Sequence, residues 1–545
     1  MAGHLPGQLT AGYLPAVPRL RPRWRHRVNA DARKPLWRST AWWIAAAVAA
    51  RNLNGQRQVR RTLAWADRPA PTGDRRSAFP LVLHVVIPVL REQQQIPAAL
   101  SWFVPLLRNF PGSTLTMVTT AREEAERQHL AAKLAGATAA DLTVERFPQL
   151  TDDELAALGK ALPGTIDGSL TGALAAEVLS SFPTTAEVVT AELARLPEPH
   201  RMVRHVHYRG DGRKAAQVNA AVDQLSTAGA DQEYIAVYDV DSRPSRELLD
   251  RTADFLAHRQ ANDGGLPCVV QQSARFATQN TAGTWWERSL CRGAARAQTL
   301  WTLRREIPNL RRYADAARRP HATPRLPGLA QTVGHGLLVR MDVFRQVGGL
   351  PTFTVLDDVA FGYRLTVDGI PVDSLPFTTT VPAAEYLREL LAQSERWFQS
   401  YLDYPQCAAR WHAEGHGSSR DHAAALTIGA YRGMAWLLVS PATAGCLALA
   451  LGPRTRLPTR AAAATALWAA TVAPVRALAA AEGRHLTVRE TAVRSAETLA
   501  GLLLKSAGPL TALGRWAVTG TRHAALAPKS NRRTAPSTTT DREFA

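Results

Sequence analysis

The stretch that decides the fold runs from residue 234 to residue 244 and reads Tyr-Ile-Ala-Val-Tyr-Asp-Val-Asp-Ser-Arg-Pro. An apolar run followed by two carboxylates, Asp239 and Asp241, is typical of a buried parallel strand that ends at a ligand-binding edge. Side chains two positions apart on a strand leave on the same face, so we expect both carboxylates to point together. Carboxylates suit a hard cation, and the stretch predicts a Mg²⁺ or Mn²⁺ site beside a diphosphate. A surface turn is the alternative reading of an Asp-x-Asp pair taken alone.

Further strand-like runs lie on both sides of this stretch, and helical patterns separate several of them. This alternation predicts βαβ units, and therefore an α/β fold with a mostly parallel central sheet. The expected strands are 81–90, 115–119, 203–208 and 268–272, and the expected helices are 121–134 and 215–225.

The chain has 545 residues, which is more than one hydrophobic core usually holds. We expect a catalytic domain at 81–405, with an Ala-rich helical insertion at about 140–200, and a C-terminal Ala/Leu-rich helical region at 423–523. The remaining predicted parts are a basic disordered arm (1–38), a short apolar or amphipathic helix (39–66), a Pro-rich linker (67–80) and a disordered tail (524–545).

The chain is strongly basic, with 65 Lys and Arg against 46 Asp and Glu and a formal net charge of +19. Such a charge favours anionic partners, and an anionic membrane surface is the simplest of them. The sequence contains no finger, helix-turn-helix or RNP pattern, so we expect no specific nucleic acid. The four cysteines form no CxxC pair, which fits a reducing compartment and a cytoplasmic catalytic domain.

Apolar stretches in the C-terminal region predict association with the cell membrane. The uncharged stretch 433–452 has the length of a transmembrane helix, whereas 461–475 is shorter and 499–518 is interrupted by Lys505 and Arg515. The latter two suit interfacial or re-entrant helices better. A buried helical domain is the alternative.

A second pair of acids, Asp357 and Asp358, opens a helical pattern. Adjacent helix positions diverge by about 100°, so we expect one of the two to face a given cleft. That carboxylate could take a proton from a hydroxyl group. Acids that merely favour a helix N-terminus are the alternative reading.

Two more motifs carry polar side chains that suit phosphates or sugars. Gln393, Arg396 and Trp397 share one face of a predicted helix, where Arg could bind phosphate oxygens and Trp could stack on a sugar ring. Lys214 stands at the start of a predicted helix and could approach a nucleotide phosphate. The glycines at 334 and 336 would allow close backbone approach to a ligand, although a tight turn is the favoured reading of this group taken alone.

Taken in order, these motifs resemble family 2 glycosyltransferases. The resemblance covers about residues 81 to 405 and begins with the strand Val-Val-Ile-Pro-Val-Leu-Arg-Glu at 85–92. It implies a GT-A fold and an inverting, metal-dependent transfer of a hexose from a nucleoside diphosphate sugar to a hydroxyl acceptor, either a glycan or lipid-linked. The glycosyltransferase would make a polysaccharide or a lipid-linked product at the inner face of the membrane.

The resemblance also implies roles for individual residues. Asp358 would be the catalytic base, and Asp239 and Asp241 would hold the metal, with Asp241 the more direct ligand. The donor would be bound by Pro88, Glu92, Lys214, Asn219, Asp239 and Asp241, and the acceptor or diphosphate by Asp357, Gln393, Arg396 and Trp397.

The chain departs from the family pattern at three places, the mildest of which is Leu356-Asp357 in place of Thr-Glu. Leu90-Arg91-Glu92 stands where Tyr-Asn-Glu is frequent, and Thr119-Thr120 stands where an Asp usually meets the nucleobase. Two alternatives remain open: a nucleotidyltransferase on a similar fold, and a non-catalytic basic protein that binds membrane or nucleic acid through a degenerate transferase domain.

Overall fold

The computed structural model describes ten segments of the chain, and the predicted arm, linker and tail lie almost wholly outside them. The first helix, α1, begins at Leu36, so the last three residues assigned to the arm are helical. The described segments are 36–66, 80–143, 146–147, 149–165, 167–196, 202–210, 212–225, 232–278, 283–319 and 328–519.

A seven-stranded sheet forms the centre of the molecule, in the order β3-β2-β1-β4-β7-β5-β8. The strands β1 to β4 pair in parallel, and β5 pairs in parallel with β8. Among the described strands of this sheet, only β7 runs antiparallel to its neighbours. Four of the six strand pairings are therefore parallel, which confirms the predicted α/β class with a mostly parallel sheet. The strands are β1 Val82–Pro88, β2 Thr114–Thr120, β3 Val203–Tyr208, β4 Glu233–Val237, β5 Val269–Gln271, β7 Leu337–Arg340 and β8 Val372–Ser374; β6 Ala274–Ala277 and β9 Thr379–Pro382 form a separate pair.

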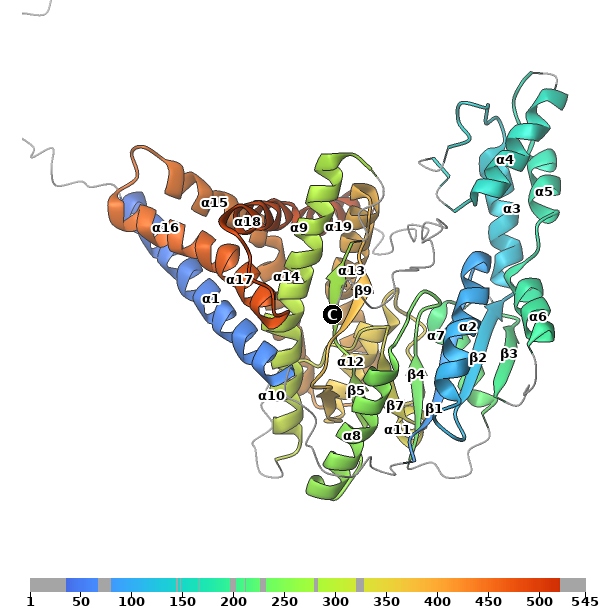
Figure 1. The fold of residues 1–545 in the computed structure, drawn as a ribbon, viewed down its shortest axis with the longest axis horizontal. Coiled ribbons are helices and arrows are strands. Elements are labelled where there is room, and N and C mark those ends of the chain that lie inside the picture. Colours follow the sequence, from blue (N-terminus) through green and yellow to red (C-terminus); the bar gives the residue numbers. More distant parts are fainter. Residues whose placement is uncertain are drawn as a thin grey trace, which may run out of the picture.

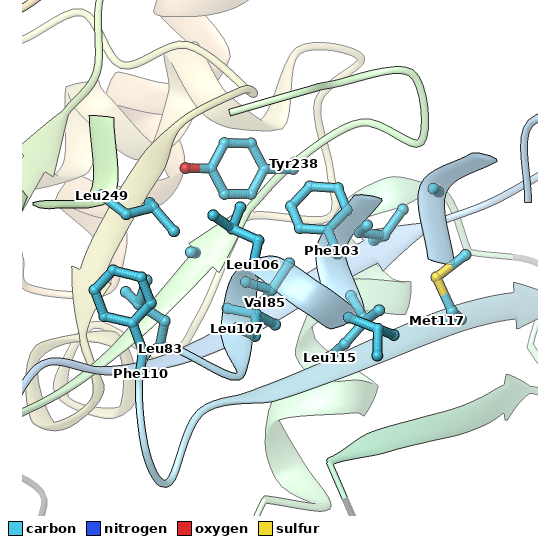
Figure 2. Packing of buried hydrophobic residues seen from close by; sticks show 14 of the residues in the cluster. Leu83, Val85, Phe103, Leu106, Leu107, Phe110, Leu115, Met117, Tyr238 and Leu249 are labelled. Carbon is cyan, nitrogen blue, oxygen red and sulfur yellow. The ribbon is translucent and has the colours of Figure 1, made fainter. Parts of the chain in front are cut away.

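Helices cover both faces of the sheet because successive strand side chains point to opposite sides. Leu83, Val85 and Ile87 of β1 enter one apolar cluster, whereas Val86 enters the other. Figure 2 shows part of the first cluster, where Phe103 and Tyr238 lie above Val85. The covering helices are α2 Ile96–Leu107, α7 Lys214–Asp223, α8 Arg246–Asp263, α10 Ile307–Ala317, α11 Met341–Gln346 and α12 Asp357–Val367.

The insertion contains a small helical unit with its own apolar core, which lies above β2 and β3 in Figure 1. Arg91, just after β1, joins the sheet to this unit. Its guanidinium donates to both carboxylate oxygens of Glu154, and its backbone N–H donates to Thr185. The helices here are α3 Arg122–Leu134, α4 Asp152–Ala161, α5 Gly172–Ser180 and α6 Thr185–Arg195.

The C-terminal helices pack against α1 and α9 on the other side of the sheet (Figure 1). Glu497 of α18 is buried and accepts from Arg292 and Arg296 of α9, which fixes these two helices together. The helices are α1 Leu36–Ala66, α9 Trp285–Trp301, the π-helix η4 Thr302–Glu306, α13 Leu387–Ala413, α14 Ser419–Leu437, α15 Val439–Leu451, α16 Leu457–Ala470, α17 Val472–Ala481, α18 Val488–Leu504 and α19 Ala507–Thr519.

The apolar segments differ in detail from the sequence expectation. Stretch 433–452 is broken between α14 and α15, which form a pair bent by 43°. Pro441 explains the break, because it has no N–H to donate to the carbonyl four residues earlier. Within the described segments, one helix is long and apolar enough to cross a bilayer, Leu457–Ala481, and half of its apolar window is buried in the protein.

The close crossing of α9 and α18 makes a first testable prediction. A Cβ at Gly293 would lie 1.8 Å from the carbonyl oxygen of Glu497, so only glycine lets the two backbones touch. We expect Gly293→Ala to lower the free energy of unfolding by about 1–3 kcal/mol through overpacking. Gly445→Ala is the control, because nothing lies within 4 Å of its added Cβ. Denaturant unfolding of both variants measures the difference, and equal stability would contradict the contact.

Candidate active site

Several predicted residues meet at the carboxyl edge of the sheet. Pro88 is the last residue of β1, and Glu92 follows it before the short 3₁₀ helix Gln93–Gln95. Asp239 follows β4, the parallel neighbour of β1. Ligands of open α/β sheets bind outside this edge, so these three residues lie where a ligand site is expected.

Lys214 is the first residue of α7 and connects two parts of the edge. Its Nζ donates to Asp239 Oδ1 at 2.8 Å and to the carbonyl oxygen of Gly334 at 2.8 Å. The Lys214 side chain is about a quarter exposed (28%) and that of Asp239 about a third (32%). The pair therefore lies at a partly open surface, within reach of a ligand.

The second acid pair faces the same place. Asp357 is buried and Asp358 is half-buried at the N-terminus of α12. Asp358 Oδ1 accepts from the N–H of Val359 at 2.8 Å. A Cβ added at Gly334 would lie 3.1 Å from Asp358 Oδ2 and 3.1 Å from Lys214 Nζ. The Gly334 backbone is thus in contact with both charged groups, and it needs the absence of a side chain.

Electrostatics confirm that these groups are neighbours. Burial raises the pKa of Asp358, while the charge of Lys214 opposes the shift and that of Asp239 adds to it. Burial, and then the Asp358 carboxylate, raise the pKa of Asp357. Asp357 Oδ2 is buried and has no hydrogen-bond partner. The site therefore holds protons more tightly than ordinary carboxylates do, as a general base working near neutral pH requires.

The helix α13 contributes Arg396 to this cluster. Burial lowers the pKa of Arg396, and the carboxylates of Asp239 and Asp358 counteract the effect. Gln393 and Trp397 instead line an apolar crevice with residues of α9 and α18, and Trp397 meets Phe276 edge to face. The predicted common face is thus divided, since adjacent helix positions diverge by about 100° and Arg396 turns away from Trp397. α13 forms a wall between the acidic cluster and the crevice.

His335 is a site residue that the sequence interpretation missed. It lies in the loop before β7, where its charge interacts with Asp239, Lys214 and Asp241. Burial is the largest effect and lowers its pKa, which favours a neutral ring, and its Nε2 is buried without a hydrogen-bond partner. Gln271 fixes this loop by donating to the carbonyl of His335 at 3.1 Å. The one signal for it in the sequence is its position between the glycines at 334 and 336.

Asp239 and Asp241 are arranged differently from the expectation. β4 ends at Val237, so the two acids lie in a turn and strand alternation does not align them. Ser242 closes the turn by donating its N–H to the Asp239 carbonyl at 2.9 Å. Asp241 is exposed, whereas Asp239 contacts Lys214 and interacts with the acid pair. Asp239, rather than Asp241, is the centre of the cluster.

Asn219, predicted to bind the donor, is hydrogen-bonded to the backbone of Leu350. Its side-chain amide donates to the Leu350 carbonyl and accepts from the Leu350 N–H, both at 2.9 Å. It lies five residues beyond Lys214 on α7, which turns it to another side of the helix by about 140°. Asn219 therefore holds the loop after α11, next to Gly349, whose positive φ of 78° requires glycine.

The acids can accommodate a divalent cation by their chemistry. Asp239 and Asp241 offer carboxylate oxygens, and diphosphate and water oxygens would complete the coordination of Mg²⁺ or Mn²⁺. Among the described residues, no three His, Cys, Asp or Glu side chains are grouped to hold a metal ion. Protein ligands alone would thus not form a full site, and a cation here would depend on the ligand that it accompanies.

Comparison with known proteins gives distant likenesses among solved structures. No protein-family model matches the chain, and no curated protein matches it. Among solved structures, it is similar to the mannosyltransferase PcManGT from Pyrobaculum calidifontis in complex with GDP-Man and Mn²⁺, at 15% identity and a TM-score of 0.41. The match covers 87% of this chain and 99% of that one. A superposition this loose carries neither the donor nor the metal of that enzyme over to this chain.

Proposed function

We propose that the protein is a glycosyltransferase of the family 2 type, with a GT-A catalytic domain, that transfers a hexose from a nucleoside diphosphate sugar to a hydroxyl acceptor. The observation that carries the proposal is the meeting of Lys214, Asp239, Asp358 and Arg396 at the carboxyl edge of a mostly parallel sheet. These groups come from four separate parts of the chain. They combine a base with two cations, as an inverting transfer requires.

In the proposed reaction, Asp358 accepts the proton of the acceptor hydroxyl. The acceptor oxygen then forms a bond to the anomeric carbon as the bond to the diphosphate breaks, and the nucleoside diphosphate leaves. The N–H of Val359 holds Asp358 Oδ1, which orients the carboxylate. Lys214 and Arg396 supply positive charge near the departing diphosphate.

A divalent cation has a clear purpose in this site. Asp239, Asp241, Asp357 and Asp358 outnumber Lys214 and Arg396, so a diphosphate would meet excess negative charge. Mg²⁺ or Mn²⁺, held by Asp239 and Asp241, would supply the missing positive charge when bound.

We also propose that the C-terminal helices and α1 associate with a membrane, and that the catalytic domain lies at the inner face of this membrane. Large apolar side chains are exposed on these helices, among them Trp43 (66%), Leu451 (74%) and Trp468 (48%). Exposed apolar surface of this extent marks an interaction site, and a lipid surface fits the basic chain. A hydroxyl acceptor carried by a lipid or a growing glycan would be reached from this surface.

Donor binding gives the direct test of the proposed function. With Mn²⁺ present, the correct nucleotide sugar should raise the melting temperature, because a ligand at 100 times its Kd stabilises a protein by about 2.7 kcal/mol. EDTA should remove most of the shift, and turnover should release nucleoside diphosphate rather than pyrophosphate. Asp239→Asn should weaken the shift, whereas Asp250→Asn on exposed α8 should not. If no nucleotide sugar changes the melting temperature or is consumed, the proposal is wrong.

A further inference from the structure

A group of five cations lies apart from the acidic cluster, where α1, η4, α14 and the end of α18 come together; its member Lys505 also lines the crevice of Gln393 and Trp397. Its members are Arg51, Arg304, Arg305, Arg432 and Lys505. Arg51 is exposed at the rim, and the other four are half-buried. We call this group the cation cluster.

Packing contacts fix the cluster between the helices. Arg304 Cδ lies 3.6 Å from the position of a Cβ at Gly55, so the side chain lies on the small surface of α1. Lys505 Nζ donates to Gln298 Oε1 at 2.6 Å and lies 5.1 Å from the centre of the Trp436 ring. Trp436 in turn donates to the Lys505 carbonyl at 2.8 Å. Contacts with α1, α9 and α14 therefore hold Arg304 and Lys505 in place.

No carboxylate compensates the cluster within the described segments. None of its five members forms an ion pair there with Asp or Glu, unlike Arg292 and Arg296, which share Glu497 nearby. Arg304 instead interacts with the like charges of Arg305 and Arg51, and Lys505 with that of Arg304.

The buried environment of the cation cluster disfavours the charged forms of its side chains. Burial above all, and then Arg304, lower the pKa of Lys505 to about 7, and burial above all lowers that of Arg304 to about 10. Arg432 Nη1 is buried with no hydrogen-bond partner. Half-buried like charges with an unused donor cost free energy, and a bound anion would remove that cost.

An exposed apolar strip begins beside the cluster. Tyr431, Met434 and Leu438 are 61%, 54% and 48% exposed, and their spacing puts them on one side of α14. The charge of Arg51 interacts with Tyr431, so the strip starts at the cationic end. A ligand that satisfies both features has an anionic head and an apolar body.

We propose that the cation cluster binds the phosphate of an anionic membrane lipid, with its acyl chains along the strip of Tyr431, Met434 and Leu438. The proposal rests on the membrane association proposed above but not on sugar transfer. A free phosphate would satisfy the charges and leave the strip uncovered, which is why we assign a lipid.

The test measures thermal stabilisation of the full chain in neutral detergent by dihexanoyl phosphatidic acid, which is too short to form a bilayer around the basic chain. We expect the wild type to be stabilised, and inorganic phosphate and dihexanoyl phosphatidylcholine to have little effect. Arg432→Gln and Arg304→Gln should each weaken the affinity at least about tenfold, since each removes a charge-assisted hydrogen bond. Arg420→Gln, an exposed charge on the same helix, is the matched control.

Two further melting measurements distinguish an effect of a substitution on folding from its effect on lipid binding. Without lipid, Arg432→Gln should melt at or above the wild-type temperature because it relieves repulsion, and Arg432→Lys should keep much of the lipid response. Equal stabilisation by inorganic phosphate, an unchanged response of both Gln variants, or a response lost equally in Arg432→Lys and Arg432→Gln would each overturn the proposal. Binding of the nucleotide sugar is measured in parallel, so a failure here leaves the glycosyltransferase proposal standing.

Discussion

Asp358→Asn is expected to reduce sugar transfer by a factor of about 10² to 10⁴, the usual contribution of a general base. Asparagine keeps the shape of the side chain and can still accept from the Val359 N–H, so the N-terminus of α12 should stay in place. It cannot take the acceptor proton at any pH. The loss should therefore appear in kcat, while the Mn²⁺-dependent stabilisation by the nucleotide sugar is retained.

The control for this variant is Asp342→Asn, which makes the same change in the ion pair of Asp342 with Arg340, outside the candidate site. Its transfer rate should stay close to that of the wild type. A measured kcat of Asp358→Asn within a few-fold of the wild type would exclude Asp358 as the base. A loss of donor binding equal to the loss of turnover would instead assign Asp358 to the donor site.

The parallel half of the sheet could be predicted from the sequence because its strands have five to seven residues, with apolar runs in β1 and β4. The run at 203–208 matches β3 at both ends, the run at 81–90 contains β1, and the run at 115–119 lies within β2, one residue short at each end. β7 escaped prediction, since it has only four residues, Leu337–Arg340, and follows a loop with two glycines. Its antiparallel direction depends on long-range pairing with β4 and β5, which no local pattern records.

The site was predicted better in its composition than in its geometry. Asp239 and Asp358 are 119 positions apart in the chain, and the order of motifs pointed to both. The role of Lys214 as a bridge between Asp239 and Gly334 required the structure. So did the structural role of Asn219, because a helical pattern gives the face of a residue but not the partner it meets.

The departure at Arg91 has a structural reason. Arg91 has a positive φ of 55°, which is rare outside glycine, and its side chain is buried against the insertion. The ion pair with Glu154 and the hydrogen bond to Thr185 hold this conformation. Arg91 therefore links the end of β1 to the helical insertion.

Asp357→Asn is expected to stabilise the protein at alkaline pH and to leave its stability almost unchanged at acid pH. The folded state raises the pKa of Asp357 through burial and the Asp358 charge. Because the native carboxyl binds its proton more tightly than the unfolded one, the native state loses relative stability as pH rises from the unfolded pKa through the raised native pKa. Each unit of that rise costs the native state about 1.4 kcal/mol once the group is ionised.

Asparagine removes this cost because it carries no charge, and it resembles the protonated acid in shape. Melting curves of wild type and variant should therefore converge below about pH 4, near the unfolded pKa, and separate progressively up to the native pKa of about 7, with the variant the more stable. Asp250→Asn on exposed α8 should show no such separation. If Asp357→Asn is less stable than the wild type at both ends of this pH range, the folded state favours the charged carboxylate of Asp357. The buried Oδ2 without a partner would then not destabilise the native protein.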